Sequence, residues 1–412
     1  MNDVLEGLER YMNPGLARTY RFMGLHSAEE TAAGAVVVDA DGVEYLDCAG
    51  GYGVFIQGYR HPRILQAAHE QLDRMPLSSR VLVSPQQVEL AQQLAELTPG
   101  DLTYSFFCNS GTEAVEAALK IARGSTGRAT IISTVGAFHG KTYGSLSVSG
   151  RELYQAPFQP LLPDVIHVPY GDLEALGSRM SENVAGVIVE PIQGEGGVIV
   201  PPDGYLAGVR RLCDRYGAAF IADEVQTGMG RTGTLFAVDH EGVVPDLLCL
   251  AKALGGGVVP IGAVVGRPWV WKLFEENPLI HTSTFGGNPL ACRVASEALA
   301  VTVDEDLPGR ARTLGQWFIS ELKTLQERHP DLLTDVRGRG LMIGLECRNA
   351  GVGGMIMAEL FQRNVLAVYT LNNERVIRMI PPLVIEPSQL EQVLDALAQS
   401  LEAVESVKDE LL

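Results

Sequence analysis

Short runs of apolar, β-branched residues alternate along this chain with longer segments in which apolar residues recur every three or four positions. Runs of the first kind predict strands and segments of the second kind predict helices, so the alternation predicts a parallel α/β sheet. Because the strand candidates are almost purely apolar, we expect helices on both faces of that sheet. A helix is expected over 204–217. The seven strand candidates are 104–108, 130–134, 165–170, 184–191, 218–224, 246–251 and 260–266.

The pattern changes near residue 300. An amphipathic helix is expected over 312–329, and further strands and a closing helix follow it. Near the N-terminus, the segment 35–48 is expected to form a β-hairpin. The strands expected after the helix lie within 336–347, 364–370 and 376–385.

These elements predict an α/β protein of two domains. A large domain over 61–300 would hold a mostly parallel, seven-stranded sheet, and a smaller α+β domain would cover 301–412. The N-terminal segment 1–60 is expected to join the smaller domain. A length of 412 residues fits one large and one smaller core.

Composition and charge exclude several classes of partner. The formal net charge of −18 would repel nucleic acid and anionic membrane surfaces, and no apolar stretch approaches the roughly 20 residues of a membrane span. Residues 1–12 are acidic and lack the features of a secretory signal. The six scattered cysteines contain no CxxC pair, and the eight histidines show no metal-binding spacing. We therefore expect a cytoplasmic protein without a metal site.

A turn of small residues follows the strand candidate 104–108. Ser110 and Glu113 have the spacing of a capping box, so a helix is expected to begin here. The backbone N–H groups of Ser110, Gly111 and Thr112 would then lie at the positive end of the helix dipole, where a phosphate can bind. An ordinary capped helix without a ligand explains the same pattern.

Two polar residues follow other strand candidates. Asp223 ends one apolar run, where the strands of an open α/β sheet border a ligand crevice; the alternative is that it caps the next turn. Lys252 directly follows the run 246–251, and burying a lysine there is costly unless its charge is paired or removed. Most lysines are exposed loop residues, but the glycines at 255–257 would let a cofactor approach closely.

Together, a phosphate seat, a strand-end acid and a strand-end lysine are the groups that pyridoxal phosphate requires. Its aldehyde needs an amine, its ring nitrogen a carboxylate and its phosphate a helix N-terminus. As an imine, Lys252 would no longer be a free ammonium. A nicotinamide dehydrogenase is disfavoured because no GxGxxG motif follows an early strand.

Motifs along essentially the whole chain resemble those of class III aminotransferases, which are fold type I pyridoxal phosphate enzymes. They are NSGTEAVEAALK, AFHGKTYGSLS, VEPIQGEGGVIVPPDGYL, ADEVQTGMGRTG, CLAKALGGGVVPIGA and TFGGNPLAC, in this order. GGYGVF and TLNNERVIRMIPPL also resemble the putrescine (diamine) aminotransferases of that class. The resemblance implies the fold type I architecture, pyridoxal 5′-phosphate as cofactor, and a homodimer or tetramer with shared active sites.

The resemblance also implies roles for single residues. Lys252 resembles the Schiff-base lysine that carries the substrate proton, and Asp223 resembles the partner of the ring nitrogen. Glu195 resembles a gate acid paired with Arg378, which would hold the carboxylate of the oxo acid. Tyr52, in GGYGVF, is expected on the substrate side. The other expected cofactor residues are Ser110, Gly111, Thr112, Phe138, His139, Glu190, Val225, Gln226 and, from a second subunit, Thr284.

One departure from the family bears on the substrate. Ornithine and acetylornithine enzymes of this class have an arginine at the position of Lys141, where it grips the α-carboxylate. Lysine cannot make that planar, bidentate contact, and a diamine has no such carboxylate; a plain solvated charge is the alternative. We therefore expect transfer of the terminal amino group of putrescine or cadaverine to 2-oxoglutarate or pyruvate. A second departure, Tyr59 where relatives commonly have histidine, has no explanation in the sequence.

Three alternatives remain open at this point. The same chemistry would serve ornithine, acetylornithine or 4-aminobutyrate. An intramolecular aminomutase would need no oxo acid, and Arg378 argues against it. A non-catalytic protein can also retain an enzyme's fold.

Overall fold

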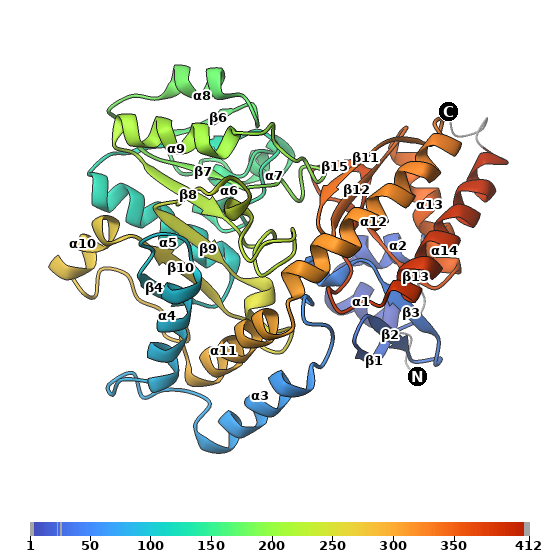
Figure 1. The fold of residues 1–412 in the computed structure, drawn as a ribbon, viewed down its shortest axis with the longest axis horizontal. Coiled ribbons are helices and arrows are strands. Elements are labelled where there is room, and N and C mark those ends of the chain that lie inside the picture. Colours follow the sequence, from blue (N-terminus) through green and yellow to red (C-terminus); the bar gives the residue numbers. More distant parts are fainter. Residues whose placement is uncertain (1–3, 23, 25–26, 408–412) are drawn as a thin grey trace.

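The computed structural model describes residues 4–22, 24 and 27–407, which form a larger and a smaller body (Figure 1). The larger body contains a seven-stranded sheet in the order β4-β10-β9-β8-β7-β5-β6. Neighbours from β9 to β6 pair in parallel, whereas β10 is antiparallel to β4 and β9. The mostly parallel sheet predicted from the apolar runs is therefore confirmed. Its strands are β4 Tyr104–Cys108, β5 Thr130–Thr134, β6 Val165–Val168, β7 Val184–Val189, β8 Ala219–Asp223, β9 Leu247–Leu250 and β10 Gly262–Gly266.

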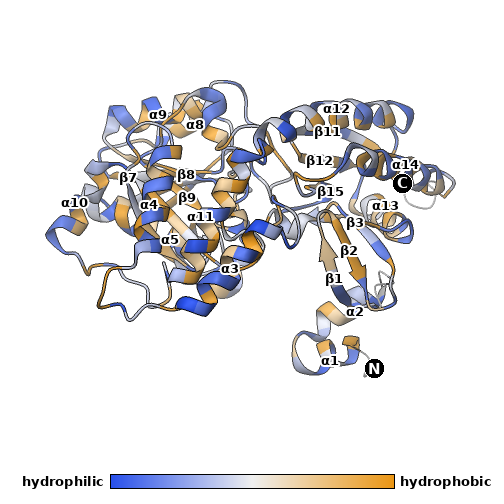
Figure 2. Ribbon diagram, turned by 60° about the horizontal axis from the view of Figure 1, so that its bottom comes forward, coloured by the Kyte–Doolittle hydropathy of each residue, from blue (hydrophilic) through white to orange (hydrophobic). Residues whose placement is uncertain are grey.

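Helices cover both faces of this sheet. α5 (Gly111–Thr126) packs on β10, β9, β8 and β7, while α9 (Tyr205–Tyr216) contacts β7 and β8. Strand residues alternate between two cores, so that Ile221 packs with the α5 side and Phe220 with the α9 side. In Figure 2 the strands between these helices are hydrophobic, and the hydrophilic parts of the helices lie outside. The predicted helix over 204–217 thus matches α9 to within one residue at each end.

Further helices complete the larger body and carry the chain into the smaller one. α3 and α4 both pack on α11, and α10 packs on α5. The short α6 and α7 follow β5, and α8 precedes β7. Their bounds are α3 Pro62–Arg74, α4 Pro85–Leu97, α6 Tyr143–Val148, α7 Glu152–Gln155, α8 Leu173–Arg179, α10 Pro268–Glu276 and α11 Pro289–Asp304.

The smaller body holds two four-stranded sheets, with orders β11-β12-β15-β14 and β1-β2-β3-β13. The predicted hairpin is present, because β2 and β3 pair antiparallel. β3 also pairs in parallel with β13, so the N-terminal segment shares a sheet with the C-terminal part of the chain. The domain limits at residues 60 and 300 stay predictions. The strands are β1 Glu29–Ala33, β2 Val36–Asp39, β3 Glu44–Asp47, β11 Leu333–Arg339, β12 Met342–Cys347, β13 Val365–Leu366, β14 Val368–Thr370 and β15 Asn373–Met379, and the helices are α1 Val4–Tyr11, α2 Pro14–Phe22, α12 Leu307–Arg328, α13 Ala350–Gln362 and α14 Pro387–Glu405.

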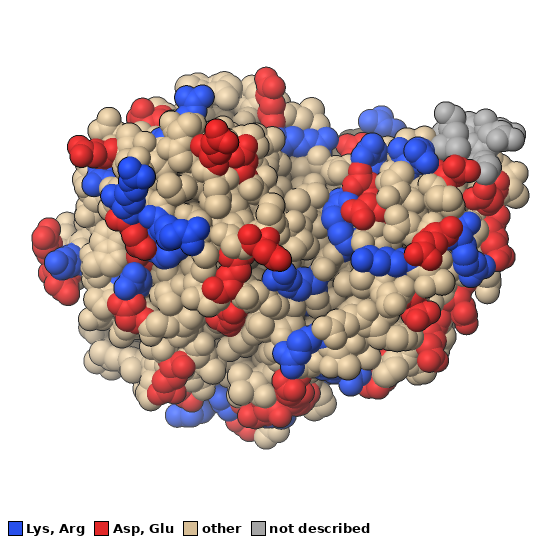
Figure 3. Space-filling model, turned by 45° about the horizontal axis from the view of Figure 1, so that its top comes forward, with Lys and Arg blue, Asp and Glu red and all other residues tan. Residues whose placement is uncertain are grey.

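The structure also shows where the thiol groups and the surface charges lie. All six cysteines are buried and free. On the face shown in Figure 3, acidic and basic side chains are interspersed, with uncharged surface between them. Within the described ranges, every helix is too short or too polar to traverse a bilayer.

Two helical glycines test how tightly the smaller body is packed. A Cβ at Gly315 in α12 would collide with the carbonyl oxygen of Gly340, whereas a Cβ at Gly354 in α13 would meet open space. We expect Gly315→Ala to lower the free energy of unfolding by about 1–3 kcal/mol because the site is overpacked. Gly354→Ala should raise it by about 0.5–1 kcal/mol, since alanine loses less backbone entropy. Thermal unfolding of the two purified variants would show shifts of opposite sign, and two shifts of the same sign would contradict this packing.

Candidate active site

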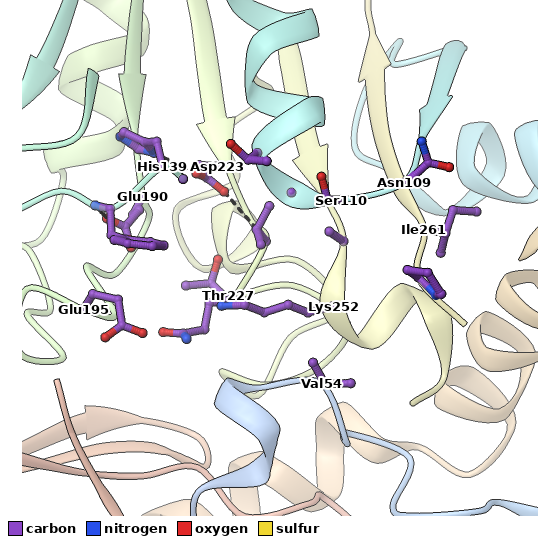
Figure 4. Close-up of a pocket in the computed structure, with 18 of the residues that line it drawn as sticks. Val54, Asn109, Ser110, His139, Glu190, Glu195, Asp223, Thr227, Lys252 and Ile261 are labelled. Atoms are coloured by element: carbon purple, nitrogen blue, oxygen red, sulfur yellow. Dashed lines mark hydrogen bonds and ion pairs between the residues drawn. The ribbon is translucent and has the colours of Figure 1, made fainter. Parts of the chain in front are cut away.

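The loops at the carboxyl ends of β7, β8 and β9 surround a cavity of about 520 Å³ (Figure 4). It is lined by residues from six separate sequence motifs. Strands β7, β8 and β9 end one to two residues earlier than predicted, because Glu190, Glu224 and Ala251 already belong to these loops. The predicted site residues that line the cavity are Ser110, Gly111, Thr112, Phe138, His139, Glu190, Glu195, Asp223, Val225, Gln226 and Lys252.

The N-terminus of α5 opens on one side of the cavity. Ser110 is the N-cap and accepts a hydrogen bond from the Glu113 N–H at 3.3 Å, while Glu113 Oε2 accepts one from the Asn109 N–H at 2.6 Å. The predicted N-cap is therefore present, but Glu113 accepts from the residue before Ser110 rather than from Ser110 itself, so the capping box is only half formed. Thr112 Oγ1 lies 2.6 Å from Ser145 Oγ and 2.8 Å from Thr142 Oγ1, so hydroxyl groups cluster beside the positive helix end. This arrangement suits an anion such as phosphate.

Asp223 lies at the end of β8 and is 4% exposed. Its Oδ2 lies 2.7 Å from Nδ1 of His139, and its Oδ1 accepts a hydrogen bond from the Val225 N–H at 3.1 Å. The second ring nitrogen of His139, Nε2, is buried without a hydrogen-bond partner within the described chain. The histidine and the backbone thus orient a carboxylate in the cavity wall, which sequence reasoning could not show.

Lys252 follows β9 at the start of the short helix η4 (Lys252–Gly255). Its φ of 47° is in the left-handed region, which costs a lysine about 1–2 kcal/mol and must be offset by the surrounding packing. Burial lowers the pKa of its amine to about 8, although Glu195 acts in the opposite direction. The amine is therefore largely neutral slightly above that pH, as a nucleophile or base requires. The exposed-loop alternative for Lys252 does not apply.

Two buried glutamates complete the polar wall. Glu190 accepts hydrogen bonds from the N–H groups of Phe138 at 2.9 Å and Gly194 at 3.0 Å. Burial raises the pKa of Glu190 to about 7, so this group gains and loses a proton near neutrality. Glu195 and Lys252 both reach into the cavity in Figure 4.

Glu195 forms an ion pair with Arg378, whose Nη1 lies 2.5 Å from Glu195 Oε1. Burial alone would raise the pKa of Glu195, but Arg378 and Lys252 outweigh it and hold the pKa below its usual value. Arg378 is fully buried and does not itself line the cavity. Its Nε and Nη2 groups have no hydrogen-bond partner in the described chain, which leaves donors available behind Glu195.

Besides Arg378, three predicted residues lie outside the cavity wall. Tyr52 is half-exposed, and its ring centroid lies 5.6 Å from Cζ of Arg378. Lys141 is exposed, with Nζ 4.3 Å from the ring centroid of Tyr154. Thr284 is exposed and contributes nothing to the cavity of its own chain. Their expected roles stay predictions.

Sequence reasoning missed a second set of cavity residues. Half of them come from the segment 257–261 behind Lys252, and these five offer small or apolar surface rather than reactive groups. The glycines at 255–257 were the one signal that pointed to this segment. The missed lining residues are Val54, Asn109, Gly140, Thr227, Ala251, Gly257, Val258, Val259, Pro260 and Ile261.

The residues present fit pyridoxal phosphate. A Cβ on Gly111 would approach Cγ1 of Val225 to 2.8 Å, and one on Gly140 would collide with the Thr112 hydroxyl, so the cradle at α5 depends on small residues. A buried carboxylate, an anion-binding helix end and an amine with a lowered pKa share one cavity. These are the three contacts that the aldehyde, ring nitrogen and phosphate require.

The pKa of Lys252 can be measured on the cofactor-free protein. We expect acetylation of Lys252 by trace acetic anhydride, quantified by peptide mapping, to rise with pH about a midpoint near 8. Glu195→Gln should move the midpoint to lower pH, because it removes the anion that favours the charged amine. Lys252→Arg identifies the labelled peptide. A midpoint that stays near that of a free lysine would contradict the burial of this amine.

Comparisons with known proteins agree with this site. Residues 21–401 match the family described as aminotransferase class-III. An ornithine aminotransferase from Toxoplasma gondii is 36% identical, with a TM-score of 0.89 and 98% of each chain covered. An acetylornithine aminotransferase from Elizabethkingia anophelis is 35% identical, with a TM-score of 0.81 and coverage of 94% of this chain and 98% of that one. An omega-transaminase from Thermomicrobium roseum is 32% identical, with a TM-score of 0.84 and 92% and 93% covered. The chain therefore belongs to the class-III aminotransferases, enzymes that use pyridoxal phosphate to move amino groups between amines and oxo acids.

Proposed function

We propose that this aminotransferase takes the terminal amino group of a diamine such as putrescine or cadaverine and transfers it to 2-oxoglutarate or pyruvate. The observation that carries the proposal is which positively charged side chains lie near the cavity. Of the described arginines, Arg378 is the one that pairs with a cavity carboxylate. Lys141 stands where ornithine and acetylornithine enzymes of the family have a second arginine. Arg378 would bind the carboxylate of the oxo acid through two hydrogen bonds. A diamine has no carboxylate and needs no such site.

Lys141 supports this choice by its position. Its Nζ lies over the ring of Tyr154 and 6.0 Å from the ring centroid of Phe138. An ammonium held against aromatic rings does not present the two parallel N–H groups with which an arginine binds an α-carboxylate. The site should therefore bind an amino acid such as ornithine less well than relatives that carry the arginine.

The residues of the cavity would divide the chemistry as follows. Pyridoxal phosphate, when bound, supplies the carbonyl group that receives the amine and the ring that withdraws electrons. Asp223, oriented by His139, would accept a hydrogen bond from the ring nitrogen and hold a proton there. Lys252, neutral slightly above pH 8, would take the proton from the substrate carbon and return it on the other side of the reaction. The N-terminus of α5 and Thr112 would hold the phosphate.

Glu195 and Arg378 would separate the two substrates by charge. While they stay paired, no net positive charge repels an incoming amine. When an oxo acid arrives, Glu195 would move aside, and the unused N–H groups of Arg378 would bind its carboxylate. This requirement for an oxo acid distinguishes the proposal from an aminomutase.

Ornithine is the second candidate donor. The ornithine and acetylornithine aminotransferases among the similar structures support an ω-amino acid at least as directly as a diamine.

We expect kcat/KM of the wild type for putrescine to exceed that for ornithine. Lys141→Arg should shift the ratio toward ornithine by about tenfold or more, because it restores a bidentate carboxylate contact. Steady-state rates with added 2-oxoglutarate and pyruvate measure both ratios, and a hundredfold wild-type preference for ornithine would reject the diamine. Lys141→Met, which cannot bind a carboxylate, is the control for effects of the mutation alone.

We further infer a homodimer. Strongly exposed apolar side chains gather in two segments, Val81–Val83 before α4 and the 279–285 stretch that contains Thr284. Apolar surface of this extent is typical of an interface, and a second copy that covered it would bring its Thr284 toward the neighbouring active site. The resemblance to the family supplies the expected contact, which is the cofactor phosphate.

Mixed dimers test the shared site. Lys252→Ala and Thr284→Glu should each abolish most activity, the second by repelling the phosphate. If Thr284 acts across the interface, refolding the two variants as a 1:1 mixture should restore about a quarter of the wild-type activity, because half of the dimers then hold one intact site. Continued inactivity of a mixture that elutes as a dimer would assign Thr284 to its own subunit or to no site. Elution of the wild type as a monomer would reject the dimer itself.

A further inference from the structure

Tyr59, the residue that departs from the histidine common in relatives, has a buried partner. Its hydroxyl donates a hydrogen bond to Asp47 Oδ2 at 2.8 Å, and its ring stacks on Phe55 with centroids 3.7 Å apart. The backbone of Tyr59 is held separately, because its N–H donates to the Gly34 carbonyl at 2.8 Å and its carbonyl accepts from the Gly34 N–H at 3.1 Å. The hydroxyl is therefore not needed to keep the chain in place, and its hydrogen bond goes to Asp47.

Asp47 is 2% exposed at the end of β3 and uses both carboxylate oxygens. While Oδ2 accepts from Tyr59, Oδ1 accepts from the N–H groups of Ala49 at 2.8 Å and Gly50 at 2.9 Å. Burial raises the pKa of Asp47, and the hydrogen bonds from Tyr59 and the two N–H groups act in the opposite direction. Tyr59 thus helps to keep a buried carboxylate charged.

The turn that Asp47 holds packs directly against the strand that carries Arg378. A Cβ on Gly50 would collide with the carbonyl oxygen of Ile380, two residues beyond Arg378. The same turn carries Tyr52, whose ring lies next to the guanidinium of Arg378. A shift of this turn would therefore displace the groups that surround Arg378.

Charge provides a second connection. Arg231 is fully buried, and burial lowers its pKa to about 9. Asp47 favours its charged form, and the neighbouring Arg378 opposes it. The two buried guanidinium groups thus repel each other, while Asp47 favours the charge of Arg231 and Glu195 pairs with Arg378. If Glu195 withdraws to admit an oxo acid, Asp47 is the anion that remains to balance the pair until the substrate carboxylate binds.

We propose that Tyr59 is a positioning residue for the oxo-acid half of the reaction, acting through Asp47 and Arg231 on the place and charge balance of Arg378. The inference rests on the proposed role of Arg378 as the ligand of the oxo-acid carboxylate. It does not depend on which amine is the donor, because the amine half of the reaction is completed while Glu195 and Arg378 remain paired.

The two half-reactions are measured separately by stopped-flow absorbance of the purified holoenzyme. Putrescine, or whichever donor proves active, converts the cofactor to its amine form, and 2-oxoglutarate converts it back. Tyr59→Phe should lower the apparent second-order rate constant for 2-oxoglutarate about tenfold, the size expected for one lost hydrogen bond to a carboxylate. The constant for the amine should change less than twofold. Tyr59→His, which keeps a ring donor, should recover most of the loss.

Two comparisons decide the outcome. Arg378→Lys, measured alongside, must slow the oxo-acid half-reaction. If it does not, the proposed role of Arg378 is rejected, whatever the result for Tyr59→Phe. If Arg378→Lys impairs that half and Tyr59→Phe leaves both halves unchanged, or slows both equally, the positioning role is overturned. An equal loss in both halves with a lowered thermal midpoint would assign Tyr59 to stability alone. Asp47→Asn should reproduce the selective loss, and a selective loss of the amine half in either variant would contradict the inference.

Discussion

The site depends on lowering the pKa of one amine inside the protein. Lys252 lies at the end of a fully buried strand, where solvation of an ammonium is lost, and burial lowers its pKa to about 8. Glu195, Asp223 and Glu190 would draw the pKa upward, and Arg378 opposes them. If every one of these carboxylates were unpaired, the amine would be held as a cation. The pairing of Glu195 with Arg378 and the burial of Glu190 are therefore conditions for the reactivity of Lys252, besides any contact that they make with a substrate.

The same balance explains why so much buried charge is tolerated. Arg378, Arg231, Asp47 and Glu195 lose solvation that a single ion pair seldom restores. Backbone groups supply much of the compensation: the turn at Ala49 and Gly50 donates to Asp47, and Leu371 donates to Glu195. Two N–H groups of Arg378 remain unused in the described chain. Unsatisfied donors beside a cavity are what a carboxylate-binding site requires before its ligand arrives.

The sequence predicted the sheet well because its strands are buried on both faces. The strands at 104–108 and 130–134 agree residue for residue, while β7, β8 and β9 end one or two residues earlier than predicted, where the chain enters the loops around the cavity. Single motifs identified Lys252, Asp223 and the helix start at Ser110, because each lies at or just beyond the end of a strand. Contacts between motifs could not be predicted in this way. The Asp223–His139 contact joins residues 84 positions apart, and that of Tyr59 with Asp47 depends on a turn whose partner strand lies near the C-terminus.

The proposed substrate preference rests on the same kind of long-range arrangement. Lys141 and Arg378 are 237 positions apart in the sequence (378 − 141), and they differ in what surrounds them. Lys141 is exposed against an aromatic ring, and Arg378 is buried against a carboxylate. Only the buried guanidinium has the rigid, desolvated setting in which a carboxylate contact gains strength over water. An exposed ammonium gains little from the same contact, because solvent already satisfies it. A donor that carries its own α-carboxylate would therefore find only an exposed ammonium at Lys141 for it, whereas a diamine would need no such contact, and Arg378 would serve the oxo acid alone.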